Sequence, residues 1–243
     1  MSTPSVSTLS LCVRKVQPPA LGPGDPETPE LSQMVDVLTR AFSNDAFTAI
    51  VTGHRPHSLD VSHARVLSKY SLTAGLLGGE VYVAETTDVA KKIVGCAIWF
   101  PPGRALYDSD DQKRLALQPL LASFSKDLRR WWDDFLPKYV KFIAAAVGEA
   151  GELHSWRLQT LAVDPDYQRK GVGTLLVNTI APTAALTKTP LCVDCSEVTN
   201  VEVYQHLGFQ LMPKEKGGDL YRCREEFTGM NGDPFSMWVL CRP

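Results

Sequence analysis

The sequence predicts an α/β (α+β) fold, because strand-like and helix-like segments alternate along its second half. Between residues 156 and 211, short apolar runs typical of strands alternate with segments in which apolar residues recur every three or four positions, as in helices. Turn-forming glycines, prolines and asparagines lie between these segments. The chain has 243 residues, enough to bury a substantial core, and we expect a single domain over residues 1–243.

Each element is predicted from the spacing of its apolar residues. Residues 30–42 are expected to form a helix, since Leu31, Met34 and Leu38 lie on one helical face. Residues 93–100 form a continuous apolar run, which is typical of a strand buried on both faces. Further strands are expected over residues 9–16, 80–86, 156–163, 191–196, 209–212 and 235–241, and further helices over residues 58–77, 173–180 and 201–207.

Residues 110–147 are predicted to be helical in two or three pieces. They carry an aromatic stripe, which favours packing in the core and leaves open a role as a lid over a substrate pocket. We expect Pro137 to break or kink this segment, because proline removes a helical hydrogen bond. The stripe consists of Trp131, Trp132, Phe135, Tyr139, Phe142 and Ile143.

The composition is that of an ordinary globular protein, with 44% hydrophobic and 21% charged residues. A net charge of -2 gives no basic face for nucleic acid. No apolar run approaches the roughly 20 residues that span a bilayer, and the N-terminus lacks a secretory signal pattern. We therefore expect no nucleic-acid partner, no membrane association and a cytoplasmic location.

The six cysteines lack the spacing of a disulfide-rich scaffold, which favours a reducing compartment. Cys192 and Cys195 form a CxxC pattern inside an expected strand. Residues three apart point to opposite faces of a strand, so a metal or a disulfide shared by these two is not expected. Both are predicted to be small buried apolar residues. No metal site is expected elsewhere, since the histidine spacing matches no zinc pattern.

Residues 161–174 carry the most informative pattern in the chain. Gly171 and Gly173 follow an expected strand, and a helix begins at once. Glycines allow a tight bend and the close approach of an anion, while a helix start offers unpaired N–H groups and the positive end of the helix dipole. Arg169 and Lys170 add positive charge. The pattern predicts a pyrophosphate-binding loop.

Spacing excludes two other phosphate-binding loops. A Walker loop needs GxxxxGK[ST], which does not occur in the chain. A dinucleotide-binding fingerprint needs a third glycine at position 176, where the chain has Leu176.

Gln168, Gly171 and Gly173 resemble the acyl-CoA signature Q/R-x-x-G-x-G/A of the GNAT acetyltransferase superfamily. Tyr204, followed by a Leu-Gly-Phe ending at Phe209, is similar to the second signature of that superfamily. The interval between the two signatures also fits.

The resemblance covers residues 80–243, and residues 9–78 only by the order of the elements. Within the superfamily, residues 200–209 and 238–243 are most similar to puromycin N-acetyltransferase-type members.

This resemblance implies a GNAT-like mixed, twisted, mostly antiparallel sheet flanked by helices, with two splayed parallel strands, residues 156–163 and 191–196. Residues 104–150 would then be a helical insertion and the leading candidate for substrate recognition. The implied cofactor is acetyl-CoA, with its pantetheine arm between the splayed strands. The backbone of Leu161, Ala162 and Val163 would bind the pantetheine amides, and Gln168, Arg169, Lys170, Gly171, Val172, Gly173 and Thr174 the pyrophosphate. Asn200 is a candidate for a further cofactor contact or, equally, for a helix N-cap.

The implied reaction is attack by an amine on the acetyl thioester. An alkylammonium has a pKa of roughly 10.4, so about one part in 2,500 is neutral at pH 7, a gap of roughly 4.6 kcal/mol. The site must lower that pKa, supply a base or accept a weaker amine. The leaving thiolate resembles cysteine, with a pKa of about 8.5, and a protonated tyrosine can donate to it. Tyr204 is the candidate acid.

The catalytic base is less well defined by the sequence. The position that carries a carboxylate in many superfamily members is expected to be Arg157 here. His154, a residue type with a pKa near 6.5, is the remaining candidate, close to Glu149 and Glu152.

The predicted function is transfer of an acetyl group to a primary amine of a small molecule. A protein or peptide N-acetyltransferase and a non-catalytic acyl-CoA-binding sensor remain alternatives. The sequence leaves open whether the protein is a monomer or a homodimer.

Overall fold

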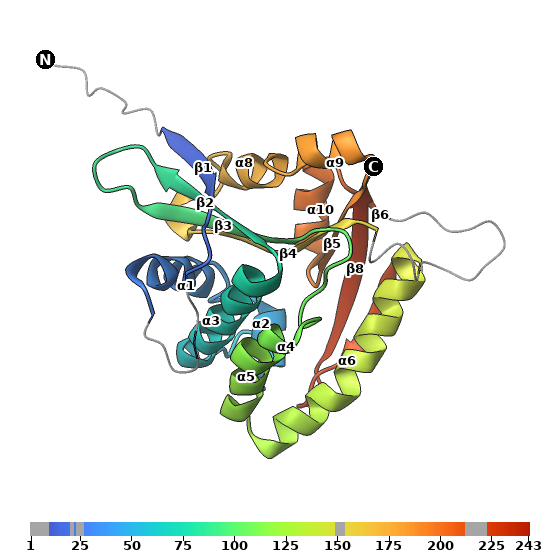
Figure 1. The fold of residues 1–243 in the computed structure, drawn as a ribbon. Helices are drawn as coiled ribbons and strands as arrows, with labels where there is room; N and C mark the ends of the chain where they lie inside the picture. The colour runs from blue at the N-terminus through green and yellow to red at the C-terminus, as the bar shows by residue number, and fades with distance from the viewer. Residues whose placement is uncertain (1–9, 20–21, 23–26, 149–153, 212–222) are drawn as a thin grey trace, which may run out of the picture.

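The computed structural model describes residues 10–19, 22, 27–148, 154–211 and 223–243. Its centre is one sheet (Figure 1). The strands are β1 (Leu11–Lys15), β2 (Glu80–Thr86), β3 (Ile93–Phe100), β4 (Trp156–Val163), β5 (Leu191–Cys195), β6 (Gln210–Leu211), β7 (Arg224–Thr228) and β8 (Pro234–Arg242). They follow the order β1-β2-β3-β4-β5-β8-β6, and β7 also pairs with β8.

All strand pairs are antiparallel except one, which is the parallel pair β4–β5. This pair is short: Trp156, Arg157 and Leu158 pair with Leu191, Cys192 and Val193. Beyond Leu158, residues 160–163 of β4 pair with β3 but not with β5, and Gln159 lies at an irregularity in the β3–β4 register. The implied mixed, mostly antiparallel sheet with two splayed parallel strands is therefore confirmed.

Helices cover both faces of the sheet (Figure 1). One face is covered by α8 (Val172–Asn178), α9 (Ala181–Thr187) and α10 (Val198–His206). The other is covered by α1 (Pro29–Ala41), α3 (Val61–Gly78) and α6 (Lys126–Val147). Shorter helices, α2 (Ala46–Val51), α4 (Asp110–Gln112) and α5 (Gln118–Ser123), complete the second layer, with a π-helical turn at Lys113–Leu117 and a 3₁₀ turn at Pro165–Tyr167.

The alternation of side chains along the strands separates two cores. In β5, Leu191 and Val193 pack under α8 to α10, while Cys192 faces α6 on the opposite side. Gly95 in β3 brings α8 close to the sheet, since an added Cβ would lie 2.7 Å from Val172 Cγ1. The helix that follows the glycine loop is therefore fixed directly against the sheet.

The aromatic stripe of α6 packs mainly in the core. Trp132, Phe135 and Phe142 are buried, and the stripe packs against β7, β8 and α2. Pro137 lies inside α6 and does not break it, so only the kink remains of the expected break or kink. Proline at this position removes the hydrogen bond to the carbonyl of Asp133. Both residues are exposed, so water can satisfy that carbonyl.

The cysteines differ from expectation at one pair. Cys192 and Cys195 are not joined to each other, as predicted, but Cys192 forms a disulfide with Cys241. These two lie directly opposite each other in the β5–β8 ladder, with Cα atoms 4.2 Å apart. Cys192 is thus not a free thiol, a pairing that the spacing of the cysteines did not predict. The described helices include none that is both long enough and apolar enough to cross a membrane.

Candidate functional site

The glycine loop joins β4 to α8 through a tight left-handed bend. Arg169 and Gly171 both have positive φ angles, 59° and 81°. Gly171 is the N-cap of α8, and no side chain caps this helix. Within the described part of the chain, the N–H groups of Val172, Gly173 and Thr174 donate no hydrogen bond. The loop therefore presents free amide donors to an anion.

The protein leaves space above these amides. An added Cβ at Gly171 would meet nothing within 4 Å, and at Gly173 its nearest neighbour would be Leu161 Cδ2 at 3.8 Å. Packing within the chain does not require glycine at either position. The positive φ explains Gly171, and the open space at both glycines fits a bound phosphate group.

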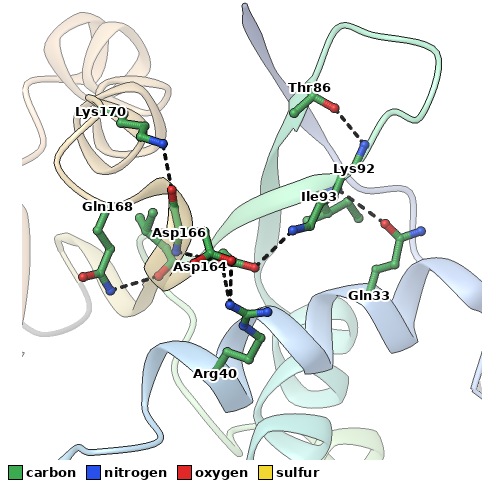
Figure 2. A network of polar contacts seen from close by, with 10 residues as sticks. Gln33, Arg40, Thr86, Lys92, Ile93, Asp164, Asp166, Gln168 and Lys170 are labelled. Carbon is green, nitrogen blue, oxygen red and sulfur yellow. Dashed lines mark hydrogen bonds and ion pairs between the residues drawn. The ribbon is translucent and has the colours of Figure 1, made fainter. Parts of the chain in front are cut away.

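The root of the loop is anchored by a buried carboxylate (Figure 2). The side chain of Asp164 is 3% exposed and accepts a hydrogen bond from the backbone N–H of Asp166. Arg40 of α1 lies 3.4 Å from one of its oxygens, and Lys92, at the beginning of the β3 segment, lies 3.6 Å from the other. Arg40 also donates to Asp166 at 2.9 Å. Three separate segments thus meet at Asp164.

Two side chains of the predicted cofactor set brace the loop itself (Figure 2). Gln168 donates from Nε2 to the carbonyl of Val163 at 3.2 Å, so this carbonyl already has a partner. Lys170 donates from Nζ to the carbonyl of Asp166 at 2.8 Å. The ring of Tyr167 lies under both Lys170 and Lys92. Lys92 and Lys170 therefore place positive charge beside the loop, where it would attract an anion such as a diphosphate.

We predict that Asp164→Asn lowers the free energy of unfolding by about 1–2 kcal/mol, because it removes the charge shared by two cations that are themselves half exposed. The melting temperature should fall by about 2–8 °C. Asp166→Asn is the matched control: its side chain is 68% exposed and contacts the same Arg40, so its change should stay below about 1 kcal/mol. Equal melting temperatures for the two variants would contradict the anchoring role.

Tyr204, the candidate acid, lies on α10 beside the end of β5. Its ring packs edge-on against Phe209 at 5.7 Å. Burial raises the pKa of Tyr204 above its ordinary value, and the charges of Cys195 and Asp194 raise it further. The hydroxyl forms no hydrogen bond with any described residue. Tyr204 is therefore a protonated donor without an internal acceptor.

The other predicted residues are placed less clearly. Asn200 is not the N-cap of α10, because the helix begins earlier, with Glu197 as its cap. Its side chain makes no hydrogen bond with a described residue. His154 is exposed in the turn before β4, at the end of that strand remote from the glycine loop. Glu149 and Glu152 lie outside the described residues.

A charged cluster that sequence reasoning did not identify lies where β4 and β5 part. The Arg157 guanidinium donates to Asp194 Oδ1 at 2.7 Å and also to the Tyr139 hydroxyl. Tyr139, on α6, donates to Asp194 Oδ2 at 2.9 Å. The one available signal was an isolated charge in each of two otherwise mostly apolar strands. Among the described residues, no group of three or more His, Cys, Asp or Glu side chains is arranged to hold a metal ion.

Comparisons with known proteins identify this fold. Residues 136–211 match the family model of the acetyltransferase (GNAT) domain. That segment spans β4, the glycine loop, β5 and Tyr204. Over almost its whole length, the chain has the mixed α/β fold of GNAT acetyltransferases.

Three solved structures illustrate this likeness. A histone acetyltransferase HPA2 and related acetyltransferase from Corynebacterium glutamicum is 19% identical, with a TM-score of 0.52 and 97% of each chain covered. A mosquito arylalkylamine N-acetyltransferase like 5b is 19% identical, with a TM-score of 0.53, covering 96% of this chain and 99% of the other. A Drosophila melanogaster polyamine N-acetyltransferase, which forms N-acetylagmatine, is 15% identical, with a TM-score of 0.53 and the same coverage. No curated protein matches the chain in sequence.

Proposed function

We propose that this protein is an N-acetyltransferase that transfers an acetyl group from acetyl-CoA to a primary amine of a small molecule. One observation carries the proposal: the parallel strands β4 and β5 stop pairing after Leu158, which leaves a gap in the ladder, while the glycine loop follows β4 and Tyr204 lies on α10, the helix that follows β5. An extended pantetheine arm would occupy this gap as an added strand. Bound acetyl-CoA supplies an activated acetyl thioester.

The chain offers separate groups for separate parts of the cofactor. The amides of Val172, Gly173 and Thr174 would hold the pyrophosphate, with the charges of Arg169 and Lys170 beside them. The backbone of Leu161, Ala162 and Val163 would bind the pantetheine amides, although the Val163 carbonyl must be shared with or released by Gln168. Asn200, in the first turn of α10, remains a candidate for a further contact.

Tyr204 would supply the proton that the sulfur takes as it leaves. A buried tyrosine whose pKa is raised remains protonated throughout the physiological range. A non-catalytic sensor would need no such donor, so the position of Tyr204 favours an enzyme over a sensor. His154 remains the base that the sequence predicts.

The acceptor class is the least constrained part of the proposal. Arylalkylamine and polyamine acetyltransferases occur among the structures with the same fold, beside a histone acetyltransferase, so the fold is compatible with a small-molecule amine as acceptor. The similarity of residues 200–209 to puromycin N-acetyltransferase-type members points the same way. We further propose a single domain in which residues 104–150 are an insertion that contributes to acceptor recognition, and a cytoplasmic protein.

The test is calorimetric titration with coenzyme A, followed by thiol release from acetyl-CoA with a panel of amines. The panel should contain arylalkylamines, polyamines, an aminonucleoside and short peptides. Binding together with amine-dependent thiol release supports the proposal. Binding with no release on any amine would favour the sensor, and release with peptides alone would favour the protein N-acetyltransferase.

A further inference from the structure

The carboxylate of Asp194 lies at the point where the paired part of β4 and β5 ends. Val193 is the last residue of β5 that pairs with β4, and Asp194 is the next residue along the strand. The gap that would receive the thioester opens at this position. Asp194 is therefore the carboxylate that strand pairing places at the closed end of the gap.

The side chain of Asp194 faces the layer of α1, α3 and α6. Its neighbours Val193 and Cys195 pack in the core under α8 to α10, so alternation directs Asp194 to the other face. There it borders a small cavity together with Arg157 and Ser155. Tyr204 approaches from the α10 side, and Asp194 contributes to raising its pKa. The proposed acid Tyr204 and the carboxylate of Asp194 thus lie close to the same end of β5, on opposite faces of the sheet.

Two donors hold the Asp194 carboxylate in place. Arg157 of β4 binds one oxygen at 2.7 Å, and Tyr139 of α6 binds the other at 2.9 Å. The Arg157 and Asp194 side chains are 9% and 12% exposed. Among the described residues, the titratable and charged groups that face Asp194 are Arg157 from β4, Tyr139 from α6 and Tyr204 from α10, with Cys195 as its neighbour on β5. A carboxylate has about four lone-pair sites, so these two hydrogen bonds leave each oxygen a further acceptor site.

We propose that Asp194 is the proton acceptor of the transfer reaction, with Arg157 and Tyr139 as its positioning residues. The proposal rests on the acetyltransferase function proposed above. The amine nitrogen forms a bond to the acetyl carbon and the bond from that carbon to sulfur breaks. The proton released from nitrogen passes to Asp194 and then to solvent, and the sulfur takes the proton of Tyr204, which solvent replaces. The products are the N-acetyl amide and free coenzyme A.

This assignment explains the arginine in the strand where a carboxylate was expected. Arg157 on β4 reaches across the ladder to Asp194 on β5, so the carboxylate has moved to the neighbouring strand. His154 lies in an exposed turn two residues before β4 begins, whereas Asp194 follows the last rung of the ladder. The geometry favours Asp194 over His154.

The experiment compares the rate of thiol release from acetyl-CoA by the full chain carrying Asp194→Asn with the rate of the wild type. Each rate is measured with the amine panel and again without amine, where only slow hydrolysis of acetyl-CoA releases thiol. The rate should fall about 100-fold or more, because removing a general base typically costs that much. Coenzyme A affinity, measured by calorimetry, should change by less than about twofold. Once the acceptor amine is neutral, the wild-type rate should level off with pH. The rate of Asp194→Asn should keep rising, since hydroxide must then take the proton that the attacking nitrogen releases.

Matched variants separate catalysis from folding. Glu225→Gln removes a carboxylate charge on the exposed side of β7, outside residues 104–150, and should leave the rate unchanged. The double variant Arg157→Gln with Asp194→Asn removes both charges of the buried pair, so it avoids leaving an unpaired ion if the single variant unfolds. It should show the same loss of rate.

Each contrary result has a distinct meaning. Rates and pH profiles of Asp194→Asn or of the double variant that equal the wild type would overturn the role of Asp194 and leave the acetyltransferase proposal standing. Loss of rate in His154→Gln, with Asp194→Asn unaffected, would overturn it in favour of His154. Failure of the wild type to bind coenzyme A would overturn both proposals.

Discussion

Gly173→Glu is expected to lower the affinity for coenzyme A about 1,000-fold. The new carboxylate would stand beside the amides of the loop, where the pyrophosphate is proposed to bind. Two like charges about 4 Å apart repel by roughly 4 kcal/mol at the effective dielectric of a protein surface. That free energy corresponds to a loss of about three orders of magnitude in affinity. Calorimetric titration with coenzyme A measures it directly.

Two further substitutions at Gly173 serve as controls. An added Cβ there lies 3.8 Å from Leu161 Cδ2, an ordinary contact, and the φ angle of Gly173 is not positive. Gly173→Ala should therefore fold normally and keep most of the affinity, as the G/A choice in the signature implies. Gly173→Gln adds the bulk of glutamate without its charge, and should lose less affinity than Gly173→Glu. If Gly173→Glu binds coenzyme A as well as Gly173→Ala does, the loop is not the pyrophosphate site.

The elements that sequence predicted best are those with a strong and continuous apolar pattern. β2, β3 and β4 occupy the expected residues; β3 is buried throughout, and a strand buried on both faces leaves little room for polar side chains. In contrast, β7 has the sequence Arg-Glu-Glu-Phe-Thr and is mostly exposed. Its place in the sheet comes from pairing with β8, which local sequence does not encode.

Helix ends were predicted less well than helix positions. α10 begins at Val198 rather than at residue 201, although Glu197 makes no side-chain cap and gives no recognisable signal. α9 was not anticipated: the expected helix over residues 173–180 ends just before it, and Pro182 lies in the first turn of α9. Proline is tolerated in the first turn of a helix, where its missing N–H has no partner in any case.

The residues of the candidate site also differ in whether the sequence alone could predict them. The glycine loop and Tyr204 could be predicted because both are local signatures with fixed spacing. The cluster of Arg157, Tyr139 and Asp194 could not, because its members come from three elements that are joined only by strand pairing and by packing of α6. The disulfide between Cys192 and Cys241 escaped prediction for the same reason: it depends on the register of β5 with β8.

Tyr204→Phe is expected to slow turnover about 10- to 100-fold and to leave the affinity for coenzyme A unchanged within about twofold. The substitution removes only the hydroxyl, and the ring contact with Phe209 remains. General acids typically raise a reaction rate 10²- to 10⁴-fold. A thiolate is already a good leaving group, so the loss of rate should be at or below the 10²-fold end of that range. Tyr70→Phe, a hydroxyl deletion on α3, is the control and should leave turnover unchanged.

The pH dependence gives this prediction a second test. The pKa of Tyr204 is raised in the folded protein, first by burial and then by Cys195 and Asp194. A tyrosine of ordinary pKa would lose its proton near pH 10, whereas Tyr204 keeps it to higher pH. The stabilisation linked to this proton is complete below about pH 10 and is lost as pH rises through the raised value. Wild-type turnover should therefore rise as the acceptor amine loses its proton and should not fall again below about pH 10. A decline in the wild-type rate between pH 8 and 9 that is absent from Tyr204→Phe would mean that the pKa of the hydroxyl is lowered below the ordinary value of a tyrosine, and would contradict the raised pKa on which its role as an acid rests.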